Sequence, residues 1–285
     1  MAKILITGTS KGIGYDSALQ FARQGHEVIA TMRNPNASDL GQVAAAESLP
    51  IDIRVLDVND SASVDDVFNA VGNLDVLVNN AGILSYNTVE DEELDKFSAV
   101  MNTNFFGVVR CCKAVVPRMR ENGQGCIINI SSTSGRIAVS PNAAYCSSKH
   151  AVEAFTESLA QELAGFGVRV HLIEPGFIDT PMVSTELPEY KSDTIYPQGR
   201  RMRAMSKLAT DGDAPANLVS DKIQYLLENK VDRLRHPVGP DSLVFFGLRA
   251  TVSDERLIEI FGQLSDEDFV AQYKQETSID LTPYL

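Results

Sequence analysis

The sequence contains no tryptophan and only four cysteines among its 285 residues. None of the cysteines forms a Cys-x-x-Cys pair, and Cys111 and Cys112 are adjacent, so the sequence offers no disulfide framework. Reduced thiols in a cytoplasmic protein are the simplest interpretation. The four histidines are scattered along the chain without the spacing of metal ligands, and we therefore expect no metal site.

Basic residues are also in short supply. The chain has 25 Lys and Arg against 38 Asp and Glu, which gives a net charge of −13. This balance argues against nucleic acid or an anionic membrane as the main partner, because both require basic patches. It leaves room for a small anionic ligand held in a local basic pocket.

Long apolar runs are absent as well. No segment approaches the roughly 18 consecutive apolar residues that a membrane span needs. The first apolar run, at residues 4–6, is too short for the core of a signal peptide and is followed at once by Thr-Gly. These features predict a cytoplasmic chain with neither a membrane span nor a secretory leader.

What the sequence does contain is a regular alternation of short apolar runs and longer amphipathic stretches. The runs are rich in Val, Ile and Leu, as in strands buried on both faces. They predict strands at residues 3–7, 27–31, 52–56, 75–78, 125–130 and 168–173. The stretches predict helices at residues 12–24, 38–48, 61–71, 90–120, 144–164 and 215–229. This order predicts an α/β protein with a single doubly wound parallel sheet of Rossmann type and helices on both faces.

The last third of the chain is less regular. Residues 177–214 show few sustained apolar periods, and residues 236–239 are consistent with a short final strand. Two or three amphipathic helices are expected from residue 241 onward. Because no linker divides the chain, we expect one domain over residues 1–285 with a helical C-terminal extension at about 241–285. Residues 251–285 contain eight acidic and two basic residues, so six of the thirteen net negative charges lie there.

A glycine-rich turn follows the first predicted strand. It reads TGTSKGIG over residues 7–14, between a predicted strand and a predicted helix. Gly8 would permit the sharp turn, Gly12 would let the backbone approach a pyrophosphate, and Gly14 would let helix and strand pack closely. Free N–H groups at the start of the helix would then face the phosphates. The alternative is an ordinary tight turn between strand and helix.

The end of the second predicted strand bears on the choice of cofactor. Proteins that prefer NAD usually have an acidic residue near this point for the ribose 2′-hydroxyl, and this chain has none. Arg33 instead offers a guanidinium suited to the 2′-phosphate of NADP, and Lys11 adds a second cation. We therefore expect a preference for NADP(H), with NAD(H) possible. The alternative is that both residues are solvated surface charges.

Two further turns follow predicted strands. Asp57 comes after the third strand, where it could meet an adenine amino group or serve instead near the start of the next helix. Asn79-Asn80-Ala81-Gly82 follows the fourth strand, and its small and amide residues suit a chain that passes close under a cofactor. Taken alone, this second segment indicates only a turn.

A candidate acid/base pair lies on the predicted helix at 144–164. Tyr145 and Lys149 are four residues apart and therefore share a face. A free phenol has a pKa of about 10, which is too high for a good base at neutral pH, and a nearby ammonium lowers it. The pair could thus serve as general acid/base for a carbonyl or alcohol. Taken alone, such a spacing is common on helix surfaces.

These motifs together resemble the short-chain dehydrogenase/reductase family. The resemblance covers about residues 3–181 and rests on the glycine turn, on Asn79-Asn80-Ala81-Gly82, on Ser132 thirteen residues before Tyr145-x-x-x-Lys149, and on Pro175-Gly176. Residues 28–33 and 234–239 resemble, more loosely, the branch with the 17β-hydroxysteroid and retinol dehydrogenases. The resemblance implies hydride transfer between a nicotinamide cofactor and a carbonyl or alcohol.

The resemblance also implies roles for individual side chains. Tyr145 would exchange the proton with the substrate oxygen, Lys149 would bind the nicotinamide ribose and lower the phenol pKa, and Ser132 would hydrogen-bond the substrate oxygen. Asn104 matches the family's helix asparagine that holds a water in the proton relay, and is chosen over Asn102 because Gly107 follows it by three residues. The residues expected to contact the cofactor are Gly8, Ser10, Lys11, Gly12, Ile13, Gly14, Arg33, Asp57, Val58, Asn80, Ala81, Gly82, Tyr145, Lys149, Pro175, Gly176, Ile178 and Thr180.

The sequence does not identify the substrate. It would be lined by residues in 84–88, 134–142 and 182–210, and the family places its substrate lid in the region at about 182–214. The basic residues from Lys191 to Lys207 could favour an acidic substrate or belong to a solvated, mobile loop, which we expect. The family commonly forms dimers or tetramers through two long helices, here about 94–120 and 144–164.

Three functions remain open from the sequence. The leading one is an NADP-dependent carbonyl reductase or alcohol dehydrogenase. The second is an NAD-linked dehydrogenase that works in the oxidative direction. The third, from a different class, is a cofactor-binding regulator without catalysis. Such regulators usually lose the tyrosine, lysine or serine of the site, and this chain keeps all three.

Overall fold

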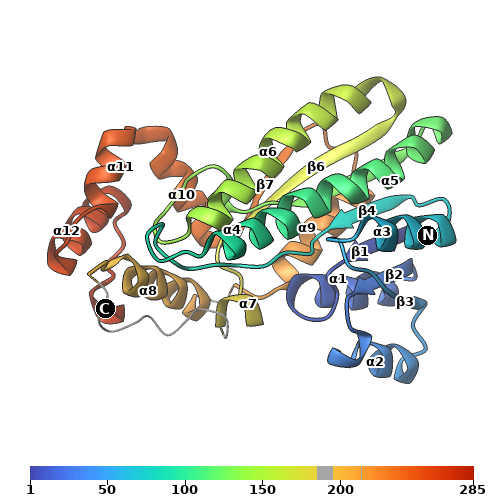
Figure 1. The fold of residues 1–285 in the computed structure, drawn as a ribbon, viewed down its shortest axis with the longest axis horizontal. Coiled ribbons are helices and arrows are strands. Elements are labelled where there is room, and N and C mark those ends of the chain that lie inside the picture. Colours follow the sequence, from blue (N-terminus) through green and yellow to red (C-terminus); the bar gives the residue numbers. More distant parts are fainter. Residues whose placement is uncertain (185–194, 213) are drawn as a thin grey trace.

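The computed structural model describes residues 1–184, 195–212 and 214–285. Its centre is one seven-stranded sheet in the order β3-β2-β1-β4-β5-β6-β7, with all neighbouring strands parallel (Figure 1). The strands are β1 Lys3–Thr7, β2 Glu27–Met32, β3 Ile51–Val55, β4 Val76–Asn79, β5 Gly125–Ile130, β6 Val168–Pro175 and β7 Arg235–Val238. The predicted doubly wound parallel sheet is confirmed.

Helices cover both faces of the sheet because side chains alternate along each strand. In β1, Ile4 and Ile6 enter one core, which also contains residues of α1 and α9, whereas Leu5 enters the other, with residues of α3, α5 and α6. The first face carries α1 Gly12–Arg23 and α9 Asn217–Glu228, and the second carries α3 Ser61–Val71, α5 Gly107–Asn122 and α6 Ala143–Leu163. This two-sided burial explains the near-continuous apolar runs in the sequence.

The strand order places the ligand crevice. From β1 the chain moves outward to β2 and β3, then returns to β4 on the other side of β1. Helices after β1 and β4 therefore lie on opposite faces, which opens a crevice at the carboxyl ends of these two strands. The glycine turn and the segment at residues 79–82 both lie at this edge.

The predicted helix at 90–120 is interrupted. The structure has α4 Leu94–Met101, a π-helical turn at Asn102–Phe106 and then α5. Such turns often accompany functional positions, and Asn104 lies in this one. The helix predicted at 38–48 is shorter in the structure. It is α2 Leu40–Ala46, and a 3₁₀ turn at Pro35–Ala37 precedes it.

The C-terminal third adds helices beyond the sheet. They are α7 Pro181–Ser184, α8 Gln198–Asp211, α10 Pro240–Thr251, α11 Asp254–Phe261 and α12 Asp266–Thr277. In Figure 1, α8, α11 and α12 lie at the left, far from β3. Buried residues from α8, α10, α11 and α12 form a third hydrophobic core with the loops around residues 86 and 137–139. None of the helices in the described part of the chain has the length and apolar character that crossing a membrane requires.

The basic region before residue 210 differs from the expected solvated loop. Residues 198–211 are helix α8, and Arg201 is only 2% exposed. Arg201 pairs through Nε with Asp266 Oδ1 at 2.7 Å, donates to the Gln263 carbonyl and lies over the Phe269 ring. Its neighbour Arg200 pairs with the same Asp266 carboxylate from a half-exposed position. The loop expectation is therefore wrong for α8, whereas Lys191 lies outside the described residues.

Arg200 and Arg201 offer a matched test of how α8 is held on α12. Arg201→Ala is expected to lower the free energy of unfolding by about 3 kcal/mol, because it removes a buried cation and leaves Gln263 and Phe269 without their partner. Arg200→Ala, which breaks a half-exposed pair with the same carboxylate, is expected to cost less than about 1 kcal/mol. Denaturant unfolding of both variants measures the difference, and equal losses would contradict the structural role given to Arg201.

Candidate active site

A single cleft at the carboxyl ends of the strands collects most of the residues that the sequence singled out. Of the expected catalytic and cofactor-binding residues, all except Gly14 and Asn104 line it. They reach it from the ends of β1 to β6 and from helix α6. The cleft also includes Asn59 and Thr103, which sequence reasoning missed because neither belongs to a recognisable motif.

The turn after β1 brings its backbone close to the backbone of the segment after β4. Gly8 and Gly12 have φ of +74° and +63°, a conformation that side chains with a Cβ rarely adopt. A Cβ on Gly8 would come 2.7 Å from the Ala81 Cα, so only glycine fits against this segment. Helix α1 then begins at Gly12 with no side-chain cap from Lys11. The first N–H groups of a helix have no partners within the helix, so this cradle fits an anionic group such as a dinucleotide pyrophosphate.

Asn80 ties the glycine turn to the segment after β4. Its Nδ2 donates to the Thr7 and Gly8 carbonyls at 2.9 and 3.0 Å, and the Thr7 hydroxyl accepts from the N–H groups of Asn80 and Ala81. Gly14 lies behind this contact, where an added Cβ would come 2.5 Å from Asn80 Nδ2. The structure therefore gives Gly14 a packing position rather than a place on the cleft surface.

The end of the cleft beside β1, β2 and β3 has three charged residues. Lys11, Arg33 and Asp57 line it at the ends of β1, β2 and β3. The Asp57 carboxylate accepts from the Asn59 N–H at 3.0 Å, whereas the cap of α3 is Asp60. Asp57 therefore does not cap α3, which was the alternative role expected for it.

The candidate acid/base group is held at the centre of the cleft. Tyr145 lies in the first turn of α6, and it lines the cleft together with Ser132, which follows β5. Burial raises the pKa of Tyr145 to about 12, and the Ser132 side chain lowers it only in part. The protein's own groups thus keep the phenol protonated at neutral pH, so the site holds a proton donor.

Lys149 lies one turn further along α6. Its Nζ is 5.5 Å from the centre of the Tyr145 ring and donates to the Ile130 carbonyl at 2.8 Å. Burial lowers the pKa of the ammonium to about 8, and the charge of Glu153 opposes this shift. The structure brings Lys149 beside the phenol as expected, but its ammonium is bound to β5 rather than to the phenol oxygen.

Asn104 stands next to the cleft but is fully buried. Its Oδ1 accepts from the Ile83 N–H at 2.8 Å, and its Nδ2 donates to the Ile83 carbonyl and to Ser148. Asn104 therefore joins the π-helical turn to the segment after β4 and to α6, and no part of it lines the cleft. The expected role in holding a water stays a prediction.

The turn after β6 is fixed from the C-terminal extension. Asp241, at the start of α10, accepts from the Phe177 N–H at 2.9 Å. A Cβ on Gly176 would come 2.1 Å from Asp241 Oδ1, so this contact requires glycine. The expected cofactor residues Pro175, Gly176, Ile178 and Thr180 all line the cleft. Asp241 had no sequence signal, because it lies far from the motif that it supports.

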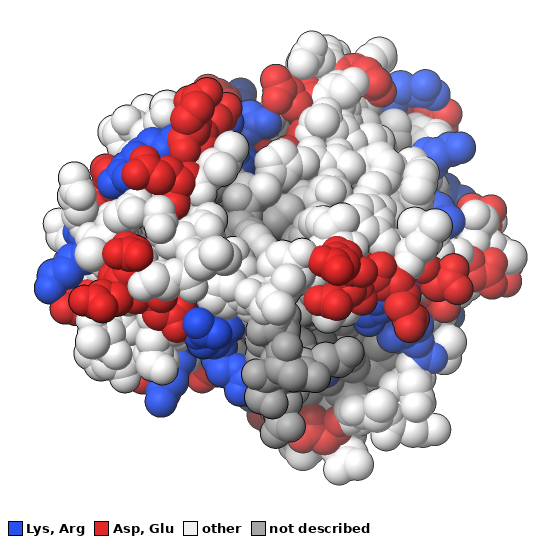
Figure 2. Space-filling view, turned by 60° about the vertical axis from the view of Figure 1, so that its left-hand side comes forward, with Lys and Arg blue, Asp and Glu red and all other residues white. Residues whose placement is uncertain are grey.

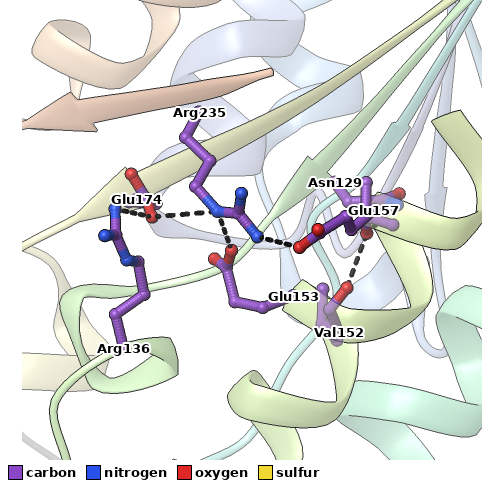
Figure 3. Close-up of polar contacts among 8 residues, drawn as sticks. Asn129, Arg136, Val152, Glu153, Glu157, Glu174 and Arg235 are labelled. Carbon is purple, nitrogen blue, oxygen red and sulfur yellow. Dashed lines mark hydrogen bonds and ion pairs between the residues drawn. The ribbon is translucent and has the colours of Figure 1, made fainter. Parts of the chain in front are cut away.

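A charge network with the buried carboxylates Glu153 and Glu174 links α6 to β6 and β7 (Figure 3). Arg235 on β7 pairs with Glu153 at 2.8 Å, with Glu157 at 2.8 Å and with Glu174 at 3.9 Å. Arg136, just after the Ser132 loop, lies 3.5 Å from the same Glu174 oxygen. Arg235 begins β7, whereas Glu174 lies near the end of β6. No motif pointed to it, since its members are spread over a hundred residues of sequence.

Glu174 is the member of this network whose charged form is destabilised by burial. Its side chain is 0% exposed, and burial together with the nearby Glu153 charge raises its pKa to about 7, against the pull of Arg136 and Arg235. A carboxyl with a raised pKa binds its proton more tightly in the native than in the unfolded chain. Folding therefore loses stability as the pH rises from the unfolded pKa of about 4.5 to about 7, and the loss is complete above this range.

Glu174→Gln removes this titration. Between pH 4.5 and 7 the wild type is expected to lose about 3 kcal/mol of unfolding free energy relative to the variant. Urea unfolding across this range measures the difference. Glu157→Gln is the matched control, because Glu157 binds the same Arg235 but is half-exposed, and its curve should run parallel to that of the wild type. A parallel curve for Glu174→Gln as well would contradict the raised pKa.

Two histidines that are far apart in the sequence meet in the fold. His171 on β6 and His236 on β7 have ring centres 5.2 Å apart, and burial lowers the pKa of both. Neutral rings can pack in this way without repulsion. In the described part of the chain, no group of three or more potential ligands could hold a metal ion.

Comparisons with known proteins and the geometry of the cleft indicate the same family of proteins. A family model for short chain dehydrogenase matches residues 2–191. A 3-ketodihydrosphingosine reductase from Bacteroides thetaiotaomicron is 36% identical over 85% of this chain and 90% of its own length. Retinol dehydrogenase 8 from Bos taurus is 40% identical over 67% of this chain and 66% of its own length. A variant of actinorhodin polyketide ketoreductase, solved with NADPH, is 28% identical with a TM-score of 0.76 over 85% of this chain and 97% of its own.

Proposed function

Since the chain belongs to the short-chain dehydrogenase/reductase family of NAD(P)-dependent oxidoreductases, we propose that it is an NADP(H)-dependent carbonyl reductase with Tyr145 as general acid/base. One observation carries the proposal. Tyr145, Ser132 and Lys149 line the same cleft as the glycine turn after β1. A substrate oxygen can therefore meet a proton donor beside a dinucleotide cradle.

The protein's part in the reaction is to position and polarise the carbonyl and to move one proton. The nicotinamide, when bound, supplies the hydride for the carbonyl carbon. Ser132 and Tyr145 hydrogen-bond the carbonyl oxygen, and the Tyr145 O–H gives its proton to that oxygen as negative charge develops there. The phenol of Tyr145 is protonated at neutral pH and can therefore donate this proton. Lys149 holds positive charge near the phenolate that remains.

The preference for NADP(H) rests on charge at the ends of β1 and β2. Arg33 lines the cleft directly after β2, and Lys11 lines it in the glycine turn. A guanidinium binds a phosphate through paired, charge-assisted hydrogen bonds. The end of β2, at Met32 and Arg33, offers no carboxylate for the ribose 2′-hydroxyl. The actinorhodin ketoreductase variant with NADPH is a structural neighbour that binds this cofactor.

Association of two or four copies of the chain through the helices at 94–120 and 144–164 stays a prediction. Two other functions stay as alternatives. The NAD-linked oxidative dehydrogenase has less support, since the end of β2 offers no carboxylate for a ribose 2′-hydroxyl. The regulator without catalysis has less support because Tyr145, Lys149 and Ser132 are all present and all line the cleft.

The test is consumption of NADPH with a panel of ketones, aldehydes and quinones, followed by absorbance. Turnover with NADPH at a higher catalytic efficiency than with NADH supports the proposal. Equal efficiency with both cofactors would overturn the cofactor preference. Binding of NADPH without turnover of any panel member would favour the regulator.

A further inference from the structure

The segment that follows β6 connects the glycine turn with the site of proton transfer. At its start, the Ser132 hydroxyl donates to the Pro175 carbonyl at 3.4 Å. Near its end, Thr180 packs on the glycine turn, since a Cβ on Gly12 would come 3.3 Å from the Thr180 Cβ. Gly176, between these two contacts, lines the cleft. A dinucleotide that extends from the cradle to the proton donor therefore has its nicotinamide end along this segment.

The carboxylate of Asp241 lies directly behind Gly176. A Cβ on Gly176 would come 2.1 and 2.3 Å from its two oxygens, and a Cβ on Gly239 would come 3.2 Å from Oδ1. Because both of these residues are glycines, neither places a side chain between the carboxylate and the backbone that lines the cleft. Asp241 itself does not line the cleft. Its charge is thus separated from the nicotinamide end by the backbone at Gly176.

The support of the turn after β6 accounts for only one oxygen of this carboxylate. Oδ2 accepts from the Phe177 N–H at 2.9 Å, whereas Oδ1 is buried and has no hydrogen-bond partner in the described part of the chain. A buried acceptor without a partner costs free energy, and a neutral asparagine could hold Phe177 as well. The charge of Asp241 therefore indicates an interaction beyond the support of the turn.

The surroundings of Asp241 act on its ionisation in both directions. Burial raises its pKa above the usual value, and the N–H groups of Phe177, Asp241 and Ser242 oppose this shift. Asp241 also lies in the first turn of α10, where the helix dipole favours a negative charge. The Tyr273 phenol nearby stays protonated, because burial and the charge of Asp241 both raise its pKa. Tyr273 therefore brings no charge to the carboxylate.

The position of Asp241 distinguishes it from most of the acidic residues that make the chain negative. Figure 2 shows the side of the molecule that carries the C-terminal helices, where many acidic side chains lie on the surface around the margin of the view. Dissolved ions screen such exposed charges over about 10 Å at 0.1 M salt. A carboxylate packed against buried backbone is screened much less, so its effect on a neighbouring ligand is stronger.

We propose, on the basis of the proposed function, that Asp241 stabilises the oxidised nicotinamide relative to the reduced one and thereby favours departure of the hydride. The nicotinamide ring is uncharged in NADPH and carries one positive charge in NADP⁺. In the reduction, the hydride moves with its two electrons to the carbonyl carbon, the oxygen gains the Tyr145 proton, and the ring becomes positive. A negative charge behind Gly176 stabilises this developing positive charge without touching the ring.

Equilibrium binding of NADPH and NADP⁺ to Asp241→Asn measures this effect without turnover. The amide keeps the shape of the side chain and an oxygen for the Phe177 N–H, but it removes the charge. We expect the Kd for NADP⁺ to rise about tenfold relative to the Kd for NADPH, which is the order of effect of a unit charge acting across protein interior. Calorimetry gives both values. A loosened turn would weaken both forms alike, so an unchanged ratio would overturn the inference.

Two further variants accompany this measurement. Asp60→Asn is the matched control, because Asp60 also accepts a backbone N–H at the start of a helix and does not line the cleft. Its ratio of Kd values should equal that of the wild type, and an equal shift in both asparagine variants would show a general effect of net charge instead. Asp241→Ser is a second neutral variant, smaller than the amide, and it should shift the ratio in the same direction as Asp241→Asn.

The same titrations with NAD⁺ and NADH separate this inference from the proposed function, since the ring undergoes the same change of charge. A shifted ratio would support the inference even if the wild type preferred NADH or reduced no ketone of the panel. Binding of both forms with an unchanged ratio would overturn the inference and leave the proposed function intact. Failure of the wild type to bind any of the four dinucleotides would overturn both.

Discussion

Replacing Tyr145 by phenylalanine is expected to lower kcat about 1,000-fold or more while NADPH still binds. The change removes only the hydroxyl, so the carbonyl oxygen loses both its proton donor and the hydrogen bond that polarises it. The ring keeps its place in the first turn of α6, and the cradle after β1 is untouched. Steady-state kinetics and NADPH titration by fluorescence measure the two effects separately.

The control is Tyr225→Phe. This tyrosine is half-exposed on α9 and does not line the cleft, so the same loss of a hydroxyl should leave kcat unchanged. Retention of turnover by Tyr145→Phe would remove Tyr145 from the role of acid/base. Loss of NADPH binding together with turnover would show instead that the phenol hydroxyl supports the cofactor site.

Arg33→Asp is expected to shift the ratio of kcat/KM for NADPH over NADH by about 1,000-fold toward NADH. The variant removes the guanidinium that would pair with a 2′-phosphate and places a carboxylate where NAD-preferring proteins bind the ribose hydroxyls. Both changes act in the same direction, since the carboxylate also repels the phosphate. Parallel kinetics with the two cofactors, at a fixed ketone that the wild type reduces, measure the ratio.

Arg54→Asp is the matched control for this charge reversal. Arg54 is an exposed residue of β3, paired with Asp52, and it does not line the cleft. The same change of net charge there should leave the cofactor ratio as in the wild type. A wild-type ratio in Arg33→Asp would show that the 2′-phosphate is bound elsewhere, with Lys11 as the next residue to vary.

The elements that sequence reasoning predicted well share a local physical cause. Strands β1, β5 and β6 are buried on both faces, so each is a short run of Val, Ile and Leu that stands out from its surroundings. Gly8 and Gly12 are needed for positive φ at a turn, which is a demand of the backbone within a few residues. The i and i+4 spacing of Tyr145 and Lys149 on one helix is local in the same sense.

The elements that were missed depend on distant partners. Arg201 reads as one of several charges in a polar stretch, and only Asp266 and Phe269, more than sixty residues later, make its burial in α8 possible. The break of the long helix at Asn102–Phe106 coincides with Asn104 bonding both Ile83 and Ser148. Nothing in the sequence indicated that His171 and His236 are neighbours, because neither segment by itself specifies that β6 pairs with β7.

The sequence by itself determined the fold class, the glycine turn after β1 and the shared helix face of Tyr145 and Lys149, because these follow from periodicity, glycine conformations and spacing within single elements. Only the tertiary structure decided what surrounds them. It placed Asp241 under the turn after β6, buried Glu174 between Arg136 and Arg235, and brought Phe245 and Met202 together as the apolar side of the cleft. Such contacts join segments far apart in the chain, and their free energy depends on burial that no single segment specifies.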